Sequence, residues 1–199
     1  MGDWRDVRIW TRDEMMKRVA RFKDLKGSDG GLPDSDVPEC ERTLYAVIGF
    51  QPPQTDSDAA TSPVGDDASS MPAIAVSEGF NVGYAKAKPG KGPLMHNHDT
   101  NETFIPMTGR WRCEWNEGPA MEYVDLEPLD VISFPVGVAR RFMNATYDEP
   151  EKEHILMFII GGNEPQAEFT PAAMKRCEQW QKQKSQPKAQ KTKQAAQRA

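Results

Sequence analysis

Short apolar runs separated by turn residues follow one another from Pro72 onward, and this pattern restricts the fold more than any other. The breaks between the runs are rich in Gly, Pro, Asn and Asp, which end strands and favour turns. Many short strands of this kind predict an all-β sandwich or barrel, which we place at residues 72–165. The runs read "AIAVSEGFNVGYAKA", "LMHNH", "ETFIPM", "RWRCEW", "MEYVDL", "DVISF", "ARRFMN" and "HILMFII".

Regular structure is also expected on both sides of this β domain. Thr11 stands three residues before Glu14 in a capping box, and the apolar spacing that follows predicts a helix over residues 11–27. Residues 42–50 are β-branched and aromatic, so we expect residues 1–50 to form a helix-strand extension that packs on the barrel. Thr170 as a cap and Pro171 at the first helical position predict a C-terminal helix within residues 166–182.

Two segments have compositions that disfavour packing. Residues 51–71 include three prolines and four aspartates, which predicts an acidic disordered linker or loop. Residues 183–199 are rich in Lys, Gln and Ala without apolar periodicity and are expected to form a basic disordered tail. The net charge of the chain is −5, and six cations without any acid lie from Lys182 onward, so the remainder carries −11. Such an acidic body gives no electrostatic reason to bind nucleic acid.

The cysteines and the hydropathy indicate the compartment. The three cysteines lie far apart, their number is odd and no CxxC occurs, so neither a disulfide framework nor a zinc ribbon is expected. The first residues lack the apolar run of a signal peptide. No apolar stretch approaches the roughly 20 residues that a membrane helix needs. We therefore expect a cytoplasmic protein that does not enter a membrane.

Two of the three histidines stand one residue apart, with a glutamate close behind. His96 and His98 point to the same side of a strand because side chains alternate. A turn at residues 99–101 is expected to bring Glu102 back beside them across a hairpin on the next strand. Two imidazoles and one carboxylate form a face that holds a divalent metal and leaves positions open. The alternative is a pair of ordinary polar residues on a strand, since short motifs often match by chance.

The longer spacing around these residues resembles the first conserved motif of the cupin superfamily. Gly90, His96, His98, Glu102 and Gly109 fill every fixed position of that motif. The resemblance implies a cupin-type double-stranded β-helix, also described as a jelly-roll barrel. It also implies that His96, His98 and Glu102 hold one divalent metal ion, which in the family is Fe, Mn, Ni, Zn or Cu.

The segment "PVGVARRFMN" resembles the second cupin motif, with one important departure. Pro135, Gly137 and Asn144 match, whereas Arg140 stands where the family has its fourth metal ligand, a histidine, and Leu129 replaces the leading glycine. The third histidine of this chain is His154, at the start of the last strand. It is a possible substitute ligand, although buried histidines at strand ends more often only find a hydrogen-bond partner.

Three arrangements are open for Arg140, whose guanidinium stays charged and cannot ligate a metal. It can bind an anionic substrate beside the metal, which suits its paired donors. It can neutralise Glu102 in a site that has lost its metal, or it can bend away to the barrel rim. The prediction adopted for Arg140 is the first, substrate binding.

Other residues carry no chemistry of their own in this interpretation. Trp111, Cys113 and Trp115 alternate on one strand face and are expected in the core or a subunit interface. Cys113 has no adjacent His or Lys to lower its pKa, which argues against a nucleophile.

The sequence thus predicts a metal-binding cupin that acts on a small anionic metabolite, with dioxygenase, isomerase and lyase chemistries all open. The alternative is a non-catalytic small-ligand-binding cupin in which Arg140 pairs with Glu102 in place of a metal. Both faces of "ILMFII" and "LYAVIGF" are apolar and need covering, so a homodimer is also expected.

Overall fold

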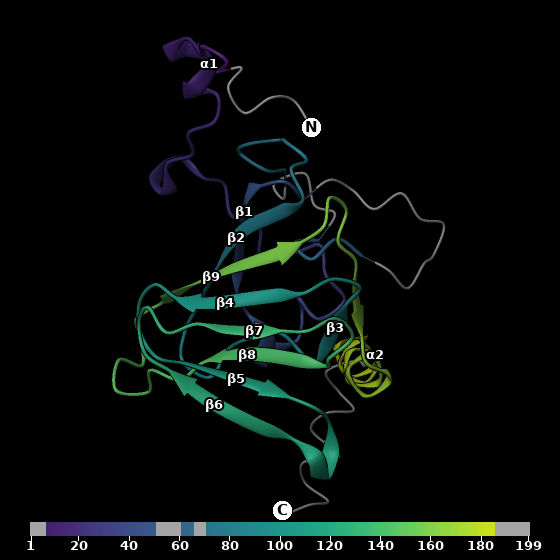
Figure 1. The fold of residues 1–199 in the computed structure, drawn as a ribbon. Coiled ribbons are helices and arrows are strands. Elements are labelled where there is room, and N and C mark those ends of the chain that lie inside the picture. Colours follow the sequence, from purple (N-terminus) through teal and green to yellow (C-terminus); the bar gives the residue numbers. More distant parts are fainter. Residues whose placement is uncertain (1–6, 51–60, 66–70, 186–199) are drawn as a thin grey trace, which may run out of the picture.

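Two antiparallel five-stranded sheets face each other in the computed structural model, which describes residues 7–50, 61–65 and 71–185 (Figure 1). The strand orders are β1-β2-β9-β4-β7 and β10-β3-β8-β5-β6. This arrangement confirms the predicted all-β jelly-roll barrel. The strands are β1 Thr43–Ile48, β2 Phe80–Ala87, β3 His96–His98, β4 Glu102–Pro106, β5 Trp111–Trp115, β6 Glu122–Leu126, β7 Ile132–Phe134, β8 Arg140–Asn144, β9 His154–Gly161 and β10 Ala167–Phe169. The helices are α1 Arg12–Met16 and α2 Pro171–Ser185, with 3₁₀ turns at Phe22–Asp24, Pro38–Cys40 and Gly118–Ala120.

The core lies between the two sheets and is built by alternation along the strands. In β9, every second residue from His154 to Ile160 is buried, while the residues between them are partly exposed. Large side chains from both sheets fill the interior, among them Phe104, Trp111 and Phe142, whose rings contact one another edge to face. Trp111 and Cys113 are fully buried and Trp115 packs against the same cluster, so their predicted core position is confirmed. The homodimer stays a prediction.

The N-terminal helix is much shorter than predicted. The capping box between Thr11 and Glu14 is present, but α1 ends at Met16 instead of continuing to Gly27. The helix has no buried residue, and Val19 and Phe22 beyond it remain 45% and 44% exposed. A helix without a packed apolar face lacks the tertiary contacts that stabilise short helices, which explains the early end. Figure 1 shows α1 standing away from both sheets.

The rest of the extension does pack on the barrel. The ring of Phe22 lies 5.3 Å from that of Tyr45 and 5.5 Å from that of Tyr84. Ser28 and Leu44 exchange two backbone hydrogen bonds of 2.8 Å. The predicted strand at residues 42–50 is present as β1, which pairs with β2.

Part of the predicted linker is also packed, contrary to expectation. Thr61 exchanges two backbone hydrogen bonds with Ala167 of β10, and Val64 is 1% exposed in the main hydrophobic cluster. Backbone pairing and the buried Val64 therefore attach residues 61–65 to the barrel, which agrees with the loop alternative and not with a disordered linker. Residues 51–60 and 66–70 of the predicted linker lie outside the described residues.

The C-terminal end of the barrel extends past the predicted boundary at residue 165. Strand β10 pairs antiparallel with β3, with Ala167 opposite His98 and Phe169 opposite His96. Helix α2 follows, with Thr170 Oγ1 accepting from the Ala173 amide at 3.3 Å as predicted for a cap. Its buried Ala173 and Cys177 join a second apolar cluster that includes Val37 and Cys40. The tail beyond residue 185 lies outside the described residues, and no helix among the described ones has the length and apolarity to span a bilayer.

Candidate metal centre

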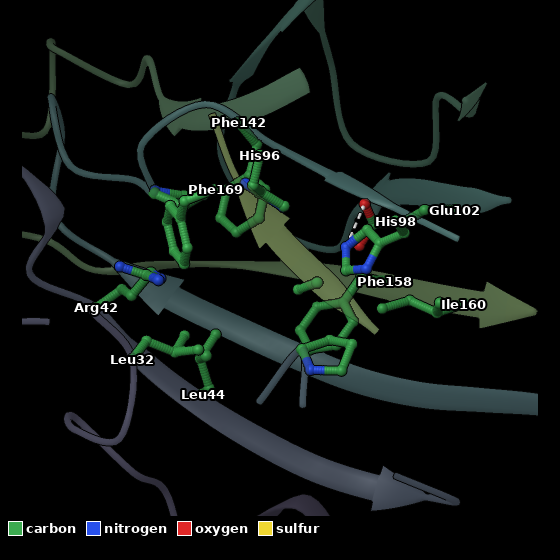
Figure 2. Close-up of a pocket in the computed structure, with 13 residues that line it drawn as sticks. Leu32, Arg42, Leu44, His96, His98, Glu102, Phe142, Phe158, Ile160 and Phe169 are labelled. Carbon is green, nitrogen blue, oxygen red and sulfur yellow. Dashed lines mark ion pairs between the residues drawn. The ribbon is translucent and has the colours of Figure 1, made fainter. Parts of the chain in front are cut away.

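Two strands of opposite sheets, β3 and β4, and the turn between them bring the predicted metal ligands together. The hairpin expected from the sequence is wrong, since β3 pairs with β8 and β10, whereas β4 pairs with β7 and β9. His96 and His98 occupy the first and last positions of β3 and are both buried, as alternation requires. The turn after His98 is held by hydrogen bonds from Gln166 N to Asp99 Oδ1 and from Gly161 N to Asn101 O. Glu102 then opens β4 and is 3% exposed. One ligand atom from each of His96, His98 and Glu102 lies within 4.8 Å of the others (Figure 2).

Backbone carbonyls fix the orientation of both imidazole rings. His96 Nδ1 lies 2.8 Å from Leu94 O, and His98 Nδ1 lies 2.8 Å from Gln166 O. Because a carbonyl only accepts, each Nδ1 carries the proton, which leaves a lone pair on each Nε2. His98 Nε2 faces Glu102 Oε2 at 3.4 Å. The lone pair of His98 therefore faces the carboxyl group of Glu102, where it can accept a proton or bind a cation.

Burial sets the charge states in this centre. It lowers the pKa of His96 to about 4, with the positive charge of Arg140 acting in the same direction. The pKa of His98 is also well below its ordinary value because of burial and the neighbouring His96. Both rings are therefore neutral at pH 7, the state in which imidazole binds metals. Burial raises the pKa of Glu102 to about 7, against the opposing attraction of Arg140.

Arg140 lies beside Glu102 in the interior of the barrel. Its Nε donates to Glu102 Oε2 at 3.0 Å and its Nη1 donates to Val138 O at 3.0 Å. Arg140 is 0% exposed, so it does not bend away to the rim. Its Nη2 has no hydrogen-bond partner among the described residues. The pairing with Glu102 is one of the three arrangements that the sequence left open.

The cavity in front of the histidines is narrow and mostly apolar. The cavity has a volume of about 30 Å³. Thirteen residues line it, and they include Arg42 but not Arg140. Arg140 thus lacks the contact with the cavity that its predicted role in substrate binding requires. The lining residues are Leu32, Arg42, Leu44, Pro63, Pro93, His96, His98, Glu102, Phe142, Phe158, Ile160, Ala167 and Phe169.

Comparisons with known proteins identify the fold. The structure of an oxalate oxidase superposes with a TM-score of 0.50 and 12% sequence identity, covering 77% of this chain and 63% of that one. This protein has the cupin fold. This fold is the one that the resemblance to the two motifs implied.

Two other structural neighbours are longer chains and superpose with lower TM-scores. Vicilin from hazelnut, Corylus avellana, has a TM-score of 0.45 and 15% identity, covering 66% of this chain and 33% of that one. The Lactobacillus farciminis oxalate decarboxylase formate complex has a TM-score of 0.45 and 12% identity, with 73% and 33% covered. This chain therefore spans less than two thirds of each of these three chains. No family model and no curated protein sequence matches it.

His154 does not supply a fourth ligand in this cupin. Glu102 pairs with Ile160 at one end of β9, whereas His154 is the first residue at the other end. Six residues of a strand separate the two positions by roughly 20 Å. His154 Nε2 instead lies 3.1 Å from Glu149 Oε2. The suggestion of a substitute ligand is therefore wrong.

The described residues fit a divalent metal with three protein ligands. Two neutral imidazole nitrogens and one carboxylate oxygen converge, and backbone carbonyls hold both Nδ1 atoms. Arg140 Nε donates to Glu102 Oε2, the oxygen that also faces His98 Nε2. Three ligands leave positions for small molecules on the metal, as in catalytic sites.

Cys113 is not suited to act as a nucleophile, as the sequence predicted. Burial raises the pKa of its thiol to about 12, so the thiol stays protonated at neutral pH.

Two buried residues at this site, Asp34 and Arg42, were not predicted from the sequence. Asp34 is 0% exposed, and its Oδ1 accepts from Arg42 Nη2 at 2.9 Å. Both belong to the N-terminal extension, which matches no known motif. The one available indication was a pair of opposite charges shortly before an apolar strand, a pattern that is common on surfaces as well.

Proposed function

We propose that this cupin binds one divalent metal ion through His96, His98 and Glu102 and presents it to a small anionic molecule. The observation that carries the proposal is the pair of ring orientations fixed by Leu94 O and Gln166 O. These hydrogen bonds leave both Nε2 atoms as acceptors, and a buried carboxylate stands beside them. In a bound state the metal would act as a Lewis acid toward an oxygen of the ligand.

The charges of the buried groups support an anionic ligand. A divalent ion would add two positive charges to the opposing charges of Glu102 and Arg140, which are 3% and 0% exposed. Uncompensated charge in a buried site is costly, so a ligand with one or two negative charges is favoured over a neutral one. The apolar walls formed by Phe142, Phe158 and Phe169 exclude water and strengthen this attraction.

The Glu102–Arg140 pair favours a second candidate, a small-ligand-binding cupin without a metal. The guanidinium of Arg140 already places a positive charge beside the carboxylate of Glu102, with Nε 3.0 Å from Oε2. In that case the cavity would hold a small ligand without a metal, while Arg140 neutralises Glu102.

Metal analysis of the untagged protein, purified without chelator, separates the two candidates. We expect near-stoichiometric metal, and a rise in melting temperature when malonate is added to the metal-loaded protein. A protein that stays empty after incubation with Fe(II), Mn(II), Ni(II) and Zn(II), but is stabilised by malonate, would refute the metal proposal and support the second candidate.

A further inference from the structure

A second guanidinium, that of Arg42, lies in the cavity wall. Its side chain is 4% exposed, and Figure 2 shows it on the opposite side of the cavity from Glu102. Arg42 precedes β1 directly, so its backbone is anchored where that strand begins. A charged side chain this deeply buried is rare unless it is paired or has a ligand.

Arg42 is held from one side only. Its Nη1 donates to Cys40 O at 2.8 Å and its Nη2 donates to Asp34 Oδ1 at 2.9 Å. These bonds use two of the five N–H groups of a guanidinium. Within the described part of the chain, the other three N–H groups have no hydrogen-bond acceptor. The planar donor fork is therefore fixed in place while part of it stays available to a ligand.

Asp34 connects this guanidinium to the metal ligands. Its second oxygen, Oδ2, accepts from the Leu94 amide at 2.9 Å. The carbonyl of the same Leu94 holds His96 Nδ1 at 2.8 Å. Arg42 and His96 are thus the two ends of one continuous hydrogen-bond network through Asp34 and Leu94. The network fixes the separation between the cation in the wall and the histidines.

We propose that Arg42 binds the anionic end of the ligand, while the ligand's other polar end lies at His96, His98 and Glu102. This inference rests on the proposed function and specifies its ligand class. The wall between the two ends is formed by Leu44, Phe142, Phe158 and Phe169, so the middle of the ligand is short and apolar. The cavity volume of about 30 Å³ is small, which favours a compact ligand. A short dicarboxylate meets these requirements.

Calorimetric titration of the metal-loaded protein with malonate and with its neutral analogue malonamide tests this assignment. In Arg42→Gln we expect the affinity for malonate to fall by roughly 10- to 100-fold, as for loss of a hydrogen bond to a charged group. The weaker affinity for malonamide should change less than threefold, and metal stoichiometry should stay at the wild-type value. Arg112→Gln is the matched control, because Arg112 pairs with Asp125 on the outer face of β5 and does not line the cavity.

The double variant Asp34→Asn/Arg42→Gln covers the case in which Arg42→Gln alone does not fold, because it leaves no unpaired carboxylate at position 34. If either variant folds, holds metal and binds malonate as tightly as the wild type, the assignment of Arg42 is wrong and the proposed function stands. Wild-type protein that prefers malonamide would also overturn it. If the wild type takes up no metal, the proposed function fails. Loss of metal-free malonate binding in Arg42→Gln would still support the assignment of Arg42.

Discussion

His98 and His154 are buried to the same degree, yet only one of them belongs to a candidate metal centre. They are 2% and 1% exposed, and each has an Nε2 close to a glutamate oxygen, at 3.4 Å from Glu102 and 3.1 Å from Glu149. Burial and a nearby carboxylate are therefore common to both ends of the barrel. Neither property distinguishes a metal site from a structural histidine.

The difference lies in what holds each ring and what surrounds it. His98 Nδ1 is bonded to Gln166 O, its carboxylate partner is buried, and a second imidazole shares the cavity. Neither ring nitrogen of His154 has a hydrogen bond to a described residue, and the side chain of Glu149 is 41% exposed. The ring of His154 packs on Gly109, where a Cβ would lie 2.4 Å from its Cγ. At that end Gly109 therefore makes room for the ring of His154, whereas His96, His98 and Glu102 form the candidate metal centre at the other end.

Alanine substitutions of His96 and of His154 test whether only the first of these two residues belongs to a metal centre. His96→Ala removes one of three ligands, so we expect the affinity for Zn(II) to fall by more than about 100-fold, since even the loss of a residue that only supports a ligand costs 10- to 100-fold. His154→Ala should lower the melting temperature through the cavity it creates, but leave metal stoichiometry unchanged. Elemental analysis of both variants provides the measurement. Full occupancy in His96→Ala, or an empty His154→Ala that is still folded, would contradict the assignment.

The ligands were predictable because their geometry is local. The strand period places His96 and His98 on one face, and a three-residue turn leads from them to Glu102 at the start of β4 in the opposite sheet. The barrel was predictable for a related reason, since turn residues interrupt the apolar runs at regular intervals. The spacing of the three ligands is local, whereas their convergence also depends on how the two sheets face each other.

The remaining errors all concern contacts between segments far apart in the chain. Arg42 is held in the cavity wall by Asp34, which also accepts a hydrogen bond from Leu94. These residues lie 8 and 52 positions from Arg42, so no local sequence pattern indicates the network. Strand β10 has three residues, too few to show alternation, and it is defined by its pairing with β3. The early end of α1 likewise follows from the absence of a packing partner for its residues. The pairing of Arg140 with Glu102 depends on how β8 and β4 face each other across the barrel.

A second test removes the charge of Arg140, which contacts Glu102 of the candidate metal centre and lies far from His154. In Arg140→Ala the buried Glu102 loses its cation and takes up a proton more readily, so its pKa should rise further. We expect the metal-free variant to lose about 1–3 kcal/mol of stability, the cost of an unsatisfied buried partner. Added metal should then raise the melting temperature more than in the wild type, since the metal becomes the only cation beside Glu102.

Arg140→His is the informative companion to that variant. It places an imidazole where the second cupin motif has one, so the affinity for Zn(II) should increase relative to the wild type. Thermal melts with and without Zn(II) measure both effects. Equal metal-induced shifts in the wild type and both variants would show that Arg140 and the metal centre are independent.

The smallest expected effect is at the other end of the barrel, in Glu149→Gln. Glu149 contacts His154 Nε2 at 3.1 Å and Lys152 Nζ at 2.9 Å, but its side chain is 41% exposed. Solvent screens such pairs, which typically contribute about 0–1 kcal/mol. For a chain of this size, that corresponds to a change of roughly 2–4 °C or less in melting temperature. Metal content and malonate affinity should equal those of the wild type, whereas the matched variant Glu102→Gln should lose metal. A loss of metal in Glu149→Gln would mean that the two ends are coupled, and the distinction between ligand and packing histidines would then fail.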